Sequence, residues 1–452
     1  MRVNYIEPII MLATVLRWLV LASITGAITG SGTSLFLHAL FYLSDRTAHI
    51  SLSTQMTLLP LGGILNGLLL YYGYRNANAD IKGSVITAIH RRSGIMSHKT
   101  ILIKPVAALI TLALGGSAGK EGPCAHIGGT LASWFGQLIR LDPEMQKRIV
   151  ACGVSAGFAS VFGTPLAGAI YGVEMLAIGR VRHDFIFPGI IAAVTSLEVS
   201  KFWGITYDSF PVHISASFSQ ILFAKIIMIG ILCGLVAWLF VELIEKIRFL
   251  FTVLQQRFHI WQPLMPTLGG LVLAALIQVI PTDYLGLSLP LMNDALQGND
   301  VAFLGFLWKL LLVAVTLGSG FYGGVVTPQF VIGALAGNAF AHMLDVGPAT
   351  GAAVGMVAVV AAASNTPIAA ILMSFELFGN VAGPYFAAAS VTAYLVIGHR
   401  SVYSDQLLAY SKSLWLRHTP DEALTPGKIQ IAYGLLRQTR RFRRGKPGKP
   451  RA

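Results

Sequence analysis

The sequence is poor in charge. Only 12% of its 452 residues are Asp, Glu, Lys or Arg, whereas 54% are hydrophobic and the mean hydropathy is +0.67. This composition excludes a water-soluble globular protein and predicts an all-α membrane protein with several spans. Cysteine is also scarce: the three cysteines, at positions 124, 152 and 233, lie in apolar sequence, so neither disulfides nor a metal site is expected.

The chain contains an internal repeat whose two copies lie about 205 residues apart. Lys104 precedes Pro123 by the same interval that separates Lys309 from Pro328, and Gly119 and Gly324 occupy matching places between them. Repeated halves with Gly- and Pro-interrupted apolar segments are typical of transporters whose two inverted-topology repeats place broken half-helices around a midplane site. We expect residues 1–210 and 211–410 to form the two transmembrane halves, followed by a C-terminal segment, 411–452.

A Thr-Pro element follows each copy of this pattern. Thr164-Pro165 and Thr366-Pro367 each open an apolar run, and a glutamate, Glu174 or Glu376, lies nine residues past the proline. The apolar stretches 149–177 and 349–377 are too long for one untilted span, so each should hold two helical pieces. Roughly eleven apolar stretches are recognisable in all.

The two ends of the chain give further expectations. Glu7 and Arg17 interrupt the first apolar run, which favours a retained first helix over a cleaved signal. The last sixteen residues carry eight of the net +13 charges, interleaved with Pro and Gly. We expect a disordered cytoplasmic tail that contacts anionic lipid rather than nucleic acid.

Two lysines lie in apolar sequence where a charge is costly unless it faces protein or water. Lys104 and Lys309 are therefore expected to support a pore, either by acting on an anion directly or by bonding carbonyls at the broken end of a helix. The repeat does not decide between these alternatives.

The glycine-rich segments before Pro123 and Pro328 read as linkers that run into helix starts. Such backbone turns its N–H groups toward a ligand, and a helix N-terminus offers about half a positive charge, which suits an anion. Glu121 in the first copy is replaced by Val326 in the second. A carboxylate there would bind the anion site itself when ionised and leave when protonated, so Glu121 is the predicted gate. The alternative is an ordinary acid in the first turn of a helix.

These motifs resemble those of the CLC family of chloride channels and proton-coupled anion exchangers. The run from Gly119 to Pro123, Gly-Lys-Glu-Gly-Pro, resembles the family's Gly-Arg/Lys-Glu-Gly-Pro motif, and Gly324 to Pro328 resembles its Gly-x-Phe-x-Pro motif. Tyr403 stands where the family carries a tyrosine that coordinates the central anion. The resemblance implies that Glu121 is the external gate. It also implies anion contacts from the residues Lys120, Gly122, Val325, Val326, Thr327 and Tyr403.

The family's Gly-Ser-Gly-Ile-Pro motif is missing. Asp80 or Lys82 aligns with its serine, depending on a two-residue shift, and Ser84 is a third candidate. We favour Lys82, with Gly83, beside the anion, because an aspartate would repel the substrate in a low-dielectric pore.

The internal proton-transfer glutamate of the chloride exchangers aligns with Met175, which cannot relay protons. Glu174 is a possible substitute, but its match to Glu376 favours a structural role for both. The segments around Thr327, Glu174 and His399 look closer to the fluoride/proton exchanger branch than to the chloride branch.

The resulting hypothesis is transport of a small monovalent anion, chloride or fluoride, by proton antiport gated at Glu121. A passive CLC-type channel is the alternative, and an intramembrane enzyme built on Ser117 and His126 is a remote one. The family resemblance further implies a homodimer in a bacterial inner membrane, without cofactors or CBS domains.

Overall fold

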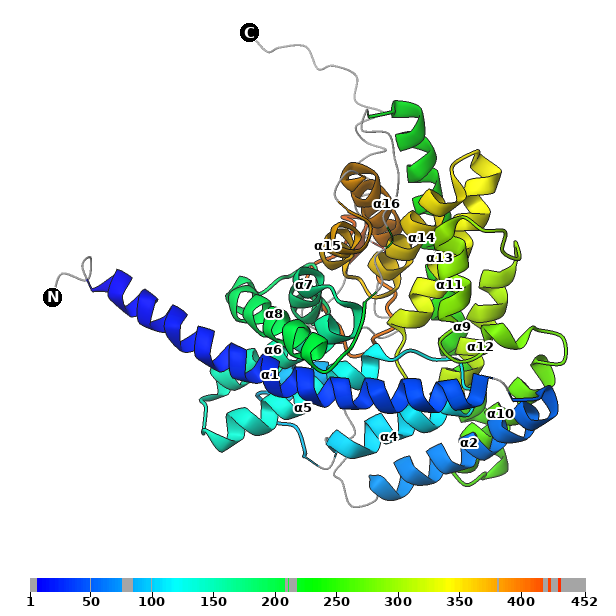
Figure 1. Cartoon of the computed structure of the whole chain (residues 1–452), viewed down its shortest axis with the longest axis horizontal. Helices are drawn as coiled ribbons and strands as arrows, with labels where there is room; N and C mark the ends of the chain where they lie inside the picture. Colours follow the sequence, from blue (N-terminus) through cyan, green and yellow to red (C-terminus); the bar gives the residue numbers. More distant parts are fainter. Residues whose placement is uncertain are drawn as a thin grey trace, which may run out of the picture.

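The protein is a bundle of helices, traced here in a computed structural model (Figure 1). The structure describes residues 6–48, 50–74, 84–98, 100–207, 210, 218–379, 382–417, 422–423 and 430–431. In this part of the chain sixteen α-helices are present. They outnumber the eleven apolar stretches of the sequence because several are half-helices of 7 to 14 residues.

The helices fall into two series of eight that correspond in order. The first series is α1 (Glu7–Ala48), α2 (Leu52–Gly73), α3 (Val85–Arg91), α4 (Thr100–Ala113), α5 (Glu121–Leu138), α6 (Pro143–Phe162), α7 (Pro165–Glu174) and α8 (Ile186–Phe202). The second is α9 (Gln220–Phe258), α10 (Leu264–Leu276), α11 (Leu289–Gln297), α12 (Gly305–Gly318), α13 (Val326–Leu344), α14 (Pro348–Ala363), α15 (Pro367–Phe378) and α16 (Gly383–Val396). Two short 3₁₀ helices, η3 (His183–Phe185) and η4 (Thr282–Tyr284), lie in connections.

The predicted Thr-Pro breaks separate α6 from α7 and α14 from α15. Proline occupies the first helical position of α7 and of α15, where its missing N–H costs nothing. The preceding helices end in the left-handed region, at Gly163 (φ 73°) and near Asn365 (φ 55°). Each long apolar stretch therefore becomes two helical pieces, as predicted.

The two series run in opposite senses where they meet. Glu174 at the end of α7 accepts hydrogen bonds from the first turn of α15, and Glu376 near the end of α15 accepts them from the first turn of α7. The two helices are therefore antiparallel neighbours, as inverted repeats require. The helix pair α2 and α10 also packs across the repeat boundary.

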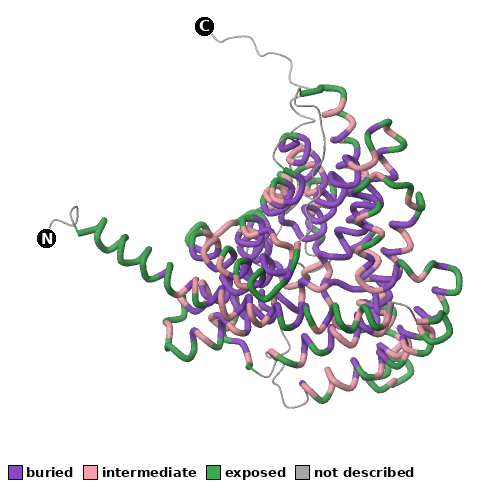
Figure 2. Tube along the Cα trace, viewed as in Figure 1, coloured by how far each residue is buried: buried purple, intermediate pink, exposed green. Residues whose placement is uncertain are grey.

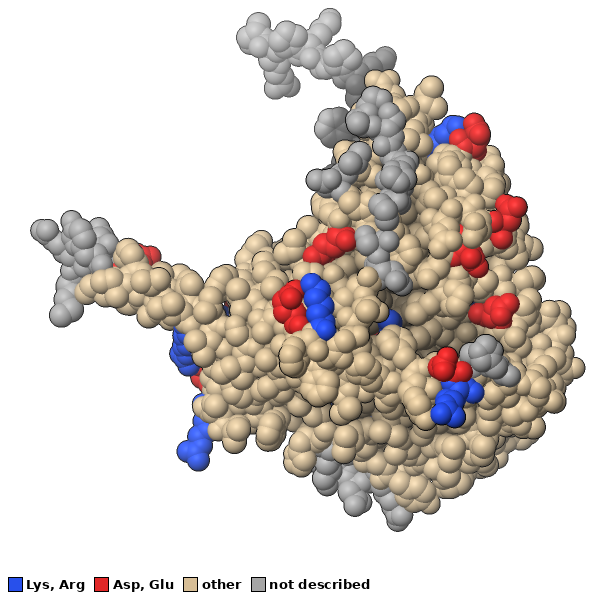
Figure 3. Space-filling model, viewed as in Figure 1, with Lys and Arg blue, Asp and Glu red and all other residues tan. Residues whose placement is uncertain are grey.

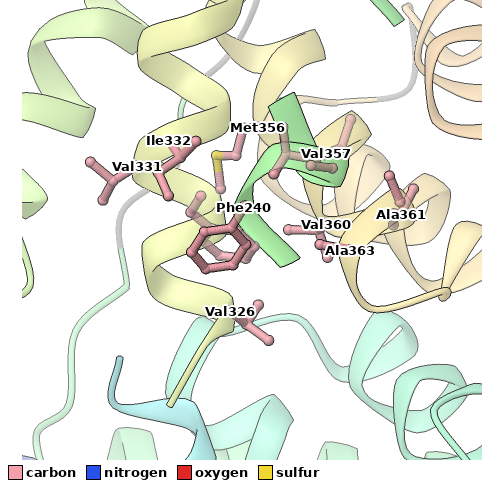
Figure 4. Packing of buried hydrophobic residues seen from close by; sticks show 14 of the residues in the cluster. Phe240, Val326, Val331, Ile332, Met356, Val357, Val360, Ala361 and Ala363 are labelled. Carbon is pink, nitrogen blue, oxygen red and sulfur yellow. The ribbon is translucent and has the colours of Figure 1, made fainter. Parts of the chain in front are cut away.

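Glycine allows the closest helix contacts of each half. A Cβ on Gly128 of α5 would overlap the carbonyl oxygen of Gly153 of α6, and a Cβ on Gly333 of α13 would overlap that of Gly355 of α14. Small residues at such crossings bring backbones together in helical membrane proteins. Phe240 of α9 packs beside α13 and α14, among Val331, Met356 and Val360 (Figure 4).

The surface agrees with a membrane location. Among the described residues, four helices, within α1, α2, η3–α8 and α9, are long and apolar enough to span a bilayer, and several shorter apolar helices accompany them. Few charged side chains interrupt the face shown in Figure 3. The first turns of α1 project from the body and are exposed (Figure 2). The basic tail lies outside the described residues.

Short strands fix the chain that follows α16. Strand β2 (Leu407–Leu408) pairs in parallel with β1 (Ala177–Ile178), directly after α7, and antiparallel with β4 (Glu422–Ala423). Strands β3 (Leu416–Arg417) and β5 (Gln430–Ile431) form a second pair. Because Val402 N also donates to Ala363 O at 3.0 Å, the segment that carries Tyr403 is held against the end of α14.

Candidate functional site

The two half-helix N-termini predicted from the repeat meet at one point. Gly119, just before α5, and Gly324, just before α13, form a reciprocal backbone bridge with both N–H to O distances at 2.8 Å. Neither of the N-cap residues, Lys120 and Val325, caps its helix with a side chain. The first N–H groups of each helix are thus open to a ligand or to a side chain from the other half.

The Glu121 carboxylate occupies the N-terminus of the opposite helix. Its oxygens accept hydrogen bonds from Val326 N (2.6 Å), Thr327 N (3.1 Å) and Thr327 Oγ1 (2.6 Å). Glu121 starts α5 but caps α13, and it is only 2% exposed. Charge-assisted bonds at a helix N-terminus are strong, about 1.5–3 kcal/mol each. The arrangement is that of an anion site filled by the protein's own carboxylate.

Glycine makes room for this carboxylate. A Cβ on Gly324 would overlap Glu121 Oε1, and one on Gly119 would overlap Glu121 Oε2. A Cβ on Gly122 would come within 2.8 Å of Gly324 Cα. The three glycines therefore keep the backbone close enough for one half to bind the side chain of the other.

A cavity of about 330 Å³ opens beside Glu121. Its polar lining includes Ser84, Lys104, Glu121, His126, Tyr171, Arg248, Tyr322, Tyr403 and Asp405. A larger vestibule of about 920 Å³ shares Ser84, Lys104, Arg248, Tyr322 and Asp405 with it, so the two spaces adjoin at those side chains. Lys104 and Arg248 give this junction positive charge, which favours the approach of an anion.

Tyr403, which the family resemblance makes an anion contact, lines the cavity, and its hydroxyl has a partner within the protein. The Tyr403 and Tyr171 oxygens lie 2.6 Å apart, and Tyr171 also donates to Ser364 Oγ at 3.4 Å. Both tyrosines line the cavity, so a pair of hydroxyls faces it rather than one.

The matched lysines of the repeat have different surroundings. Lys309 is fully buried and donates to Gly286 O (2.8 Å), Ser288 Oγ (2.9 Å) and Tyr284 O (3.2 Å), so its charge is compensated by the chain around η4. Lys104 lines both cavities, and its ammonium lies 5.7 Å from the centre of the Tyr322 ring. Lys309 thus bonds backbone carbonyls, which is one of the two alternatives drawn from the sequence, and Lys104 lies beside the cavity.

The remaining predicted residues fall into three groups. Gly122 and Val325 line the cavity, whereas Val326 and Thr327 face Glu121 instead. Pro123 and Pro328 are buried third residues of α5 and α13. Asp80, Lys82 and Gly83 lie outside the described residues, and Ser84 donates to Asp405 Oδ2 at 2.6 Å.

Lys120 was predicted to contact the anion, but the structure places it elsewhere. Its ammonium lies 5.1 Å from the centre of the Phe41 ring of α1, and it does not line the cavity. The reason is helical geometry, because neighbouring residues at a helix start point in different directions and Glu121 takes the inward one.

Glu174 and Glu376 serve as reciprocal helix caps. Glu174 accepts from Ile368 N (3.1 Å) and Ala369 N (2.9 Å), and Glu376 accepts from Leu166 N (2.8 Å) and Ala167 N (2.9 Å). Met175, one residue after Glu174, lines the cavity. The geometry thus supports the shared structural role that the repeat suggested.

Four polar residues of the cavity lining were not predicted from the sequence: Tyr171, Arg248, Tyr322 and Asp405. Tyr171 and Met373 occupy matching positions of the repeat, three residues before Glu174 and Glu376. The polar residue in only one copy could have marked Tyr171 as a candidate. Asp405 lies two residues past Tyr403, in a loop that the repeat does not cover, so nothing but its charge distinguished it.

Comparison with known proteins gives the family. The family model described as voltage gated chloride channel matches residues 62–398. A chloride/fluoride channel protein of Pseudomonas syringae pv. tomato is 34% identical over 414 residues, which cover 90% of each chain. A voltage-gated ClC-type chloride channel of Escherichia coli (strain SMS-3-5) is 28% identical over 392 residues, 80% of this chain and 91% of its own.

Solved structures agree with this result. The crystal structure of a CLC-type fluoride/proton antiporter superposes with a TM-score of 0.81 at 28% identity and covers 87% of this chain and 98% of its own. A slow cyanobacterial Cl⁻/H⁺ antiporter, at 22% identity and a TM-score of 0.71 over 84% and 94%, shares the fold. The family, the fold class and the exclusion of an enzyme are thereby confirmed: the chain belongs to the voltage gated chloride channel family, the CLC family, whose members are channels or transporters.

Proposed function

We propose that this protein moves a small monovalent anion, chloride or fluoride, across a bacterial membrane in exchange for protons, with Glu121 as the gate. The observation that carries the proposal is the Glu121 carboxylate on Val326 N and Thr327 N, at the N-terminus of α13. An anion and this carboxylate compete for the same donors, so one must leave for the other to bind.

Protonation supplies the switch. A neutral carboxylic acid loses the charge that these donors favour, which releases Glu121 and opens the N-terminus of α13 to the anion. Each return of the ionised side chain expels an anion, so proton and anion movements are linked. The relatives named for chloride/fluoride conduction and for fluoride/proton antiport support this assignment, and fluoride is the anion to test first.

The other predicted residues take supporting roles in this proposal. Lys104 attracts the anion electrostatically, Tyr403 donates its hydroxyl to the anion in place of Tyr171, and Lys309 secures the chain beside α12. We also propose a homodimer with one pathway in each subunit, two transmembrane halves at 1–210 and 211–410, and a cytoplasmic basic tail in segment 411–452 that contacts anionic lipid. Cross-linking in the native membrane, with and without the tail, tests these assignments.

The second candidate is a passive channel. Met175 favours it, because a thioether in the cavity gives protons no binding site along the route that the chloride exchangers use.

One experiment separates the two candidates. Purified protein in proteoliposomes is loaded with fluoride or chloride, and anion release and external pH are recorded together. If the protein is an exchanger, protons enter the proteoliposomes as the anion leaves. Glu121→Gln should then abolish proton uptake while anion release continues. Glu198→Gln, at an exposed position on α8, is the matched control. Anion release without proton movement in the unmodified protein would establish the channel.

A further inference from the structure

A second carboxylate lies on the same path as Glu121. Within the part of the chain that the structure describes, Glu121 and Asp405 are the two carboxylate residues that line the 330 Å³ cavity. Asp405 also lines the 920 Å³ vestibule, whereas Glu121 does not. Asp405 therefore stands at the junction of the two spaces, and Glu121 stands deeper.

The contacts of Asp405 link it to the start of α3. Its Oδ2 atom accepts hydrogen bonds from Ser84 Oγ (2.6 Å) and Thr87 Oγ1 (2.8 Å), and Ser84 Oγ in turn accepts from Thr87 N at 3.2 Å. Both hydroxyls are thus committed to the carboxylate when Asp405 is ionised. Neither can then donate to an anion in the cavity.

Charged groups reach this position from several elements. Lys104 of α4 and Arg248 of α9 line both spaces beside it, and Lys104 interacts electrostatically with Asp405 and with Arg92 at the end of α3. Among the described residues that line both spaces, the two cations and Asp405 sum to one excess positive charge when all three are ionised. Protonation of Asp405 raises this excess to two, which strengthens the attraction for an anion.

We propose that Asp405 is the second proton-binding group of the pathway and that its protonation admits the anion to the cavity. This inference rests on the proposed antiport. A proton that arrives from the cavity side binds a carboxylate oxygen of Asp405, which releases the Ser84 and Thr87 hydroxyls. The anion then enters from the vestibule beside the neutral acid, and the proton leaves to vestibule water. Asp405 thereby supplies the vestibule-side proton site that Met175 cannot provide.

The test is Asp405→Asn, with Asp45→Asn at an exposed position of α1 as the control. Asparagine keeps the size of aspartate and one acceptor oxygen, but it has no carboxylate that could bind a proton. We expect proton uptake per released anion to fall at least tenfold in Asp405→Asn, with anion release retained, and to stay unchanged in Asp45→Asn. An unchanged ratio in Asp405→Asn would overturn the proposal.

The same measurements distinguish a failure of the proposed antiport from a failure of the proposed role of Asp405. If the unmodified protein releases anion without protons, the proposed function is wrong before any variant is compared. If the unmodified protein is coupled and Glu121→Gln uncouples it while Asp405→Asn does not, the antiport stands and the role of Asp405 is wrong.

A cysteine variant covers the case in which Asp405→Asn does not fold. The native cysteines, Cys124, Cys152 and Cys233, are buried, so a thiol at position 405 is the accessible one from the vestibule. After Asp405→Cys, a thiol reagent that attaches a carboxylate should restore proton coupling, and a neutral reagent of equal size should not. Equal effects of the two reagents would contradict a proton-binding role.

Discussion

The reciprocal caps formed by Glu174 and Glu376 allow a direct test of whether Glu174 relays protons. We expect Glu174→Gln and Glu376→Gln to destabilise the protein and to leave the ratio of protons to anions unchanged. Because proline, which has no N–H, occupies the first position of α7 and of α15, the next two backbone N–H groups of each helix need acceptors. The N-cap threonines do not accept hydrogen bonds from them, so the glutamates do.

The size of the effect follows from these contacts. Each carboxylate accepts two backbone hydrogen bonds, at 2.8–2.9 Å for Glu376 and 2.9–3.1 Å for Glu174. Glutamine retains one acceptor oxygen and loses the charge that complements the helix N-terminus, so we expect a loss of about 1–3 kcal/mol for either variant. Glu174 is only 5% exposed and should be the more costly of the two.

The assay combines two measurements on the same preparations. Thermal unfolding in detergent reports stability, and parallel anion and proton recordings in proteoliposomes report coupling. Each variant is the matched control of the other, because the repeat gives both residues the same geometry. Uncoupling by Glu174→Gln, with Glu376→Gln still coupled, would refute the structural reading and make Glu174 a proton relay.

Two further predictions concern the glycines and lysines. Gly324→Ala should lower coupled transport at least tenfold, because the added methyl group overlaps the Glu121 carboxylate. Gly347→Ala is the control and should not lower it, because the new Cβ would lie 3.7 Å from its nearest neighbour. Equal transport rates of the two variants in flux assays would contradict this prediction. Lys309→Met should destabilise the fold by about 2–4 kcal/mol, because two buried carbonyls lose their donor. Lys104→Met should slow anion flux severalfold in efflux assays, because it removes a positive charge beside the cavity; an unchanged rate would contradict the assignment.

Much of the architecture could be predicted from the sequence, because it depends on local chemistry and on spacing. Apolar composition required membrane helices, the Thr-Pro elements required breaks, and the repeat of Lys, Pro and Glu indicated two related halves. Glycine before each helix start indicated where an N-terminus was left open. Glu121 stood out because its counterpart, Val326, is apolar.

Tertiary structure decided which groups meet. The sequence places Glu121 at the start of α5, but only the antiparallel packing of the halves puts its carboxylate on α13. The same packing gives Lys309 three acceptors and leaves Lys104 beside the cavity, although their sequence contexts match. Asp405 accepts a hydrogen bond from Ser84, which lies 321 residues earlier in the sequence. Spacing along a chain fixes local backbone form, whereas the partner of a buried charge depends on contacts between distant segments, which no local pattern encodes.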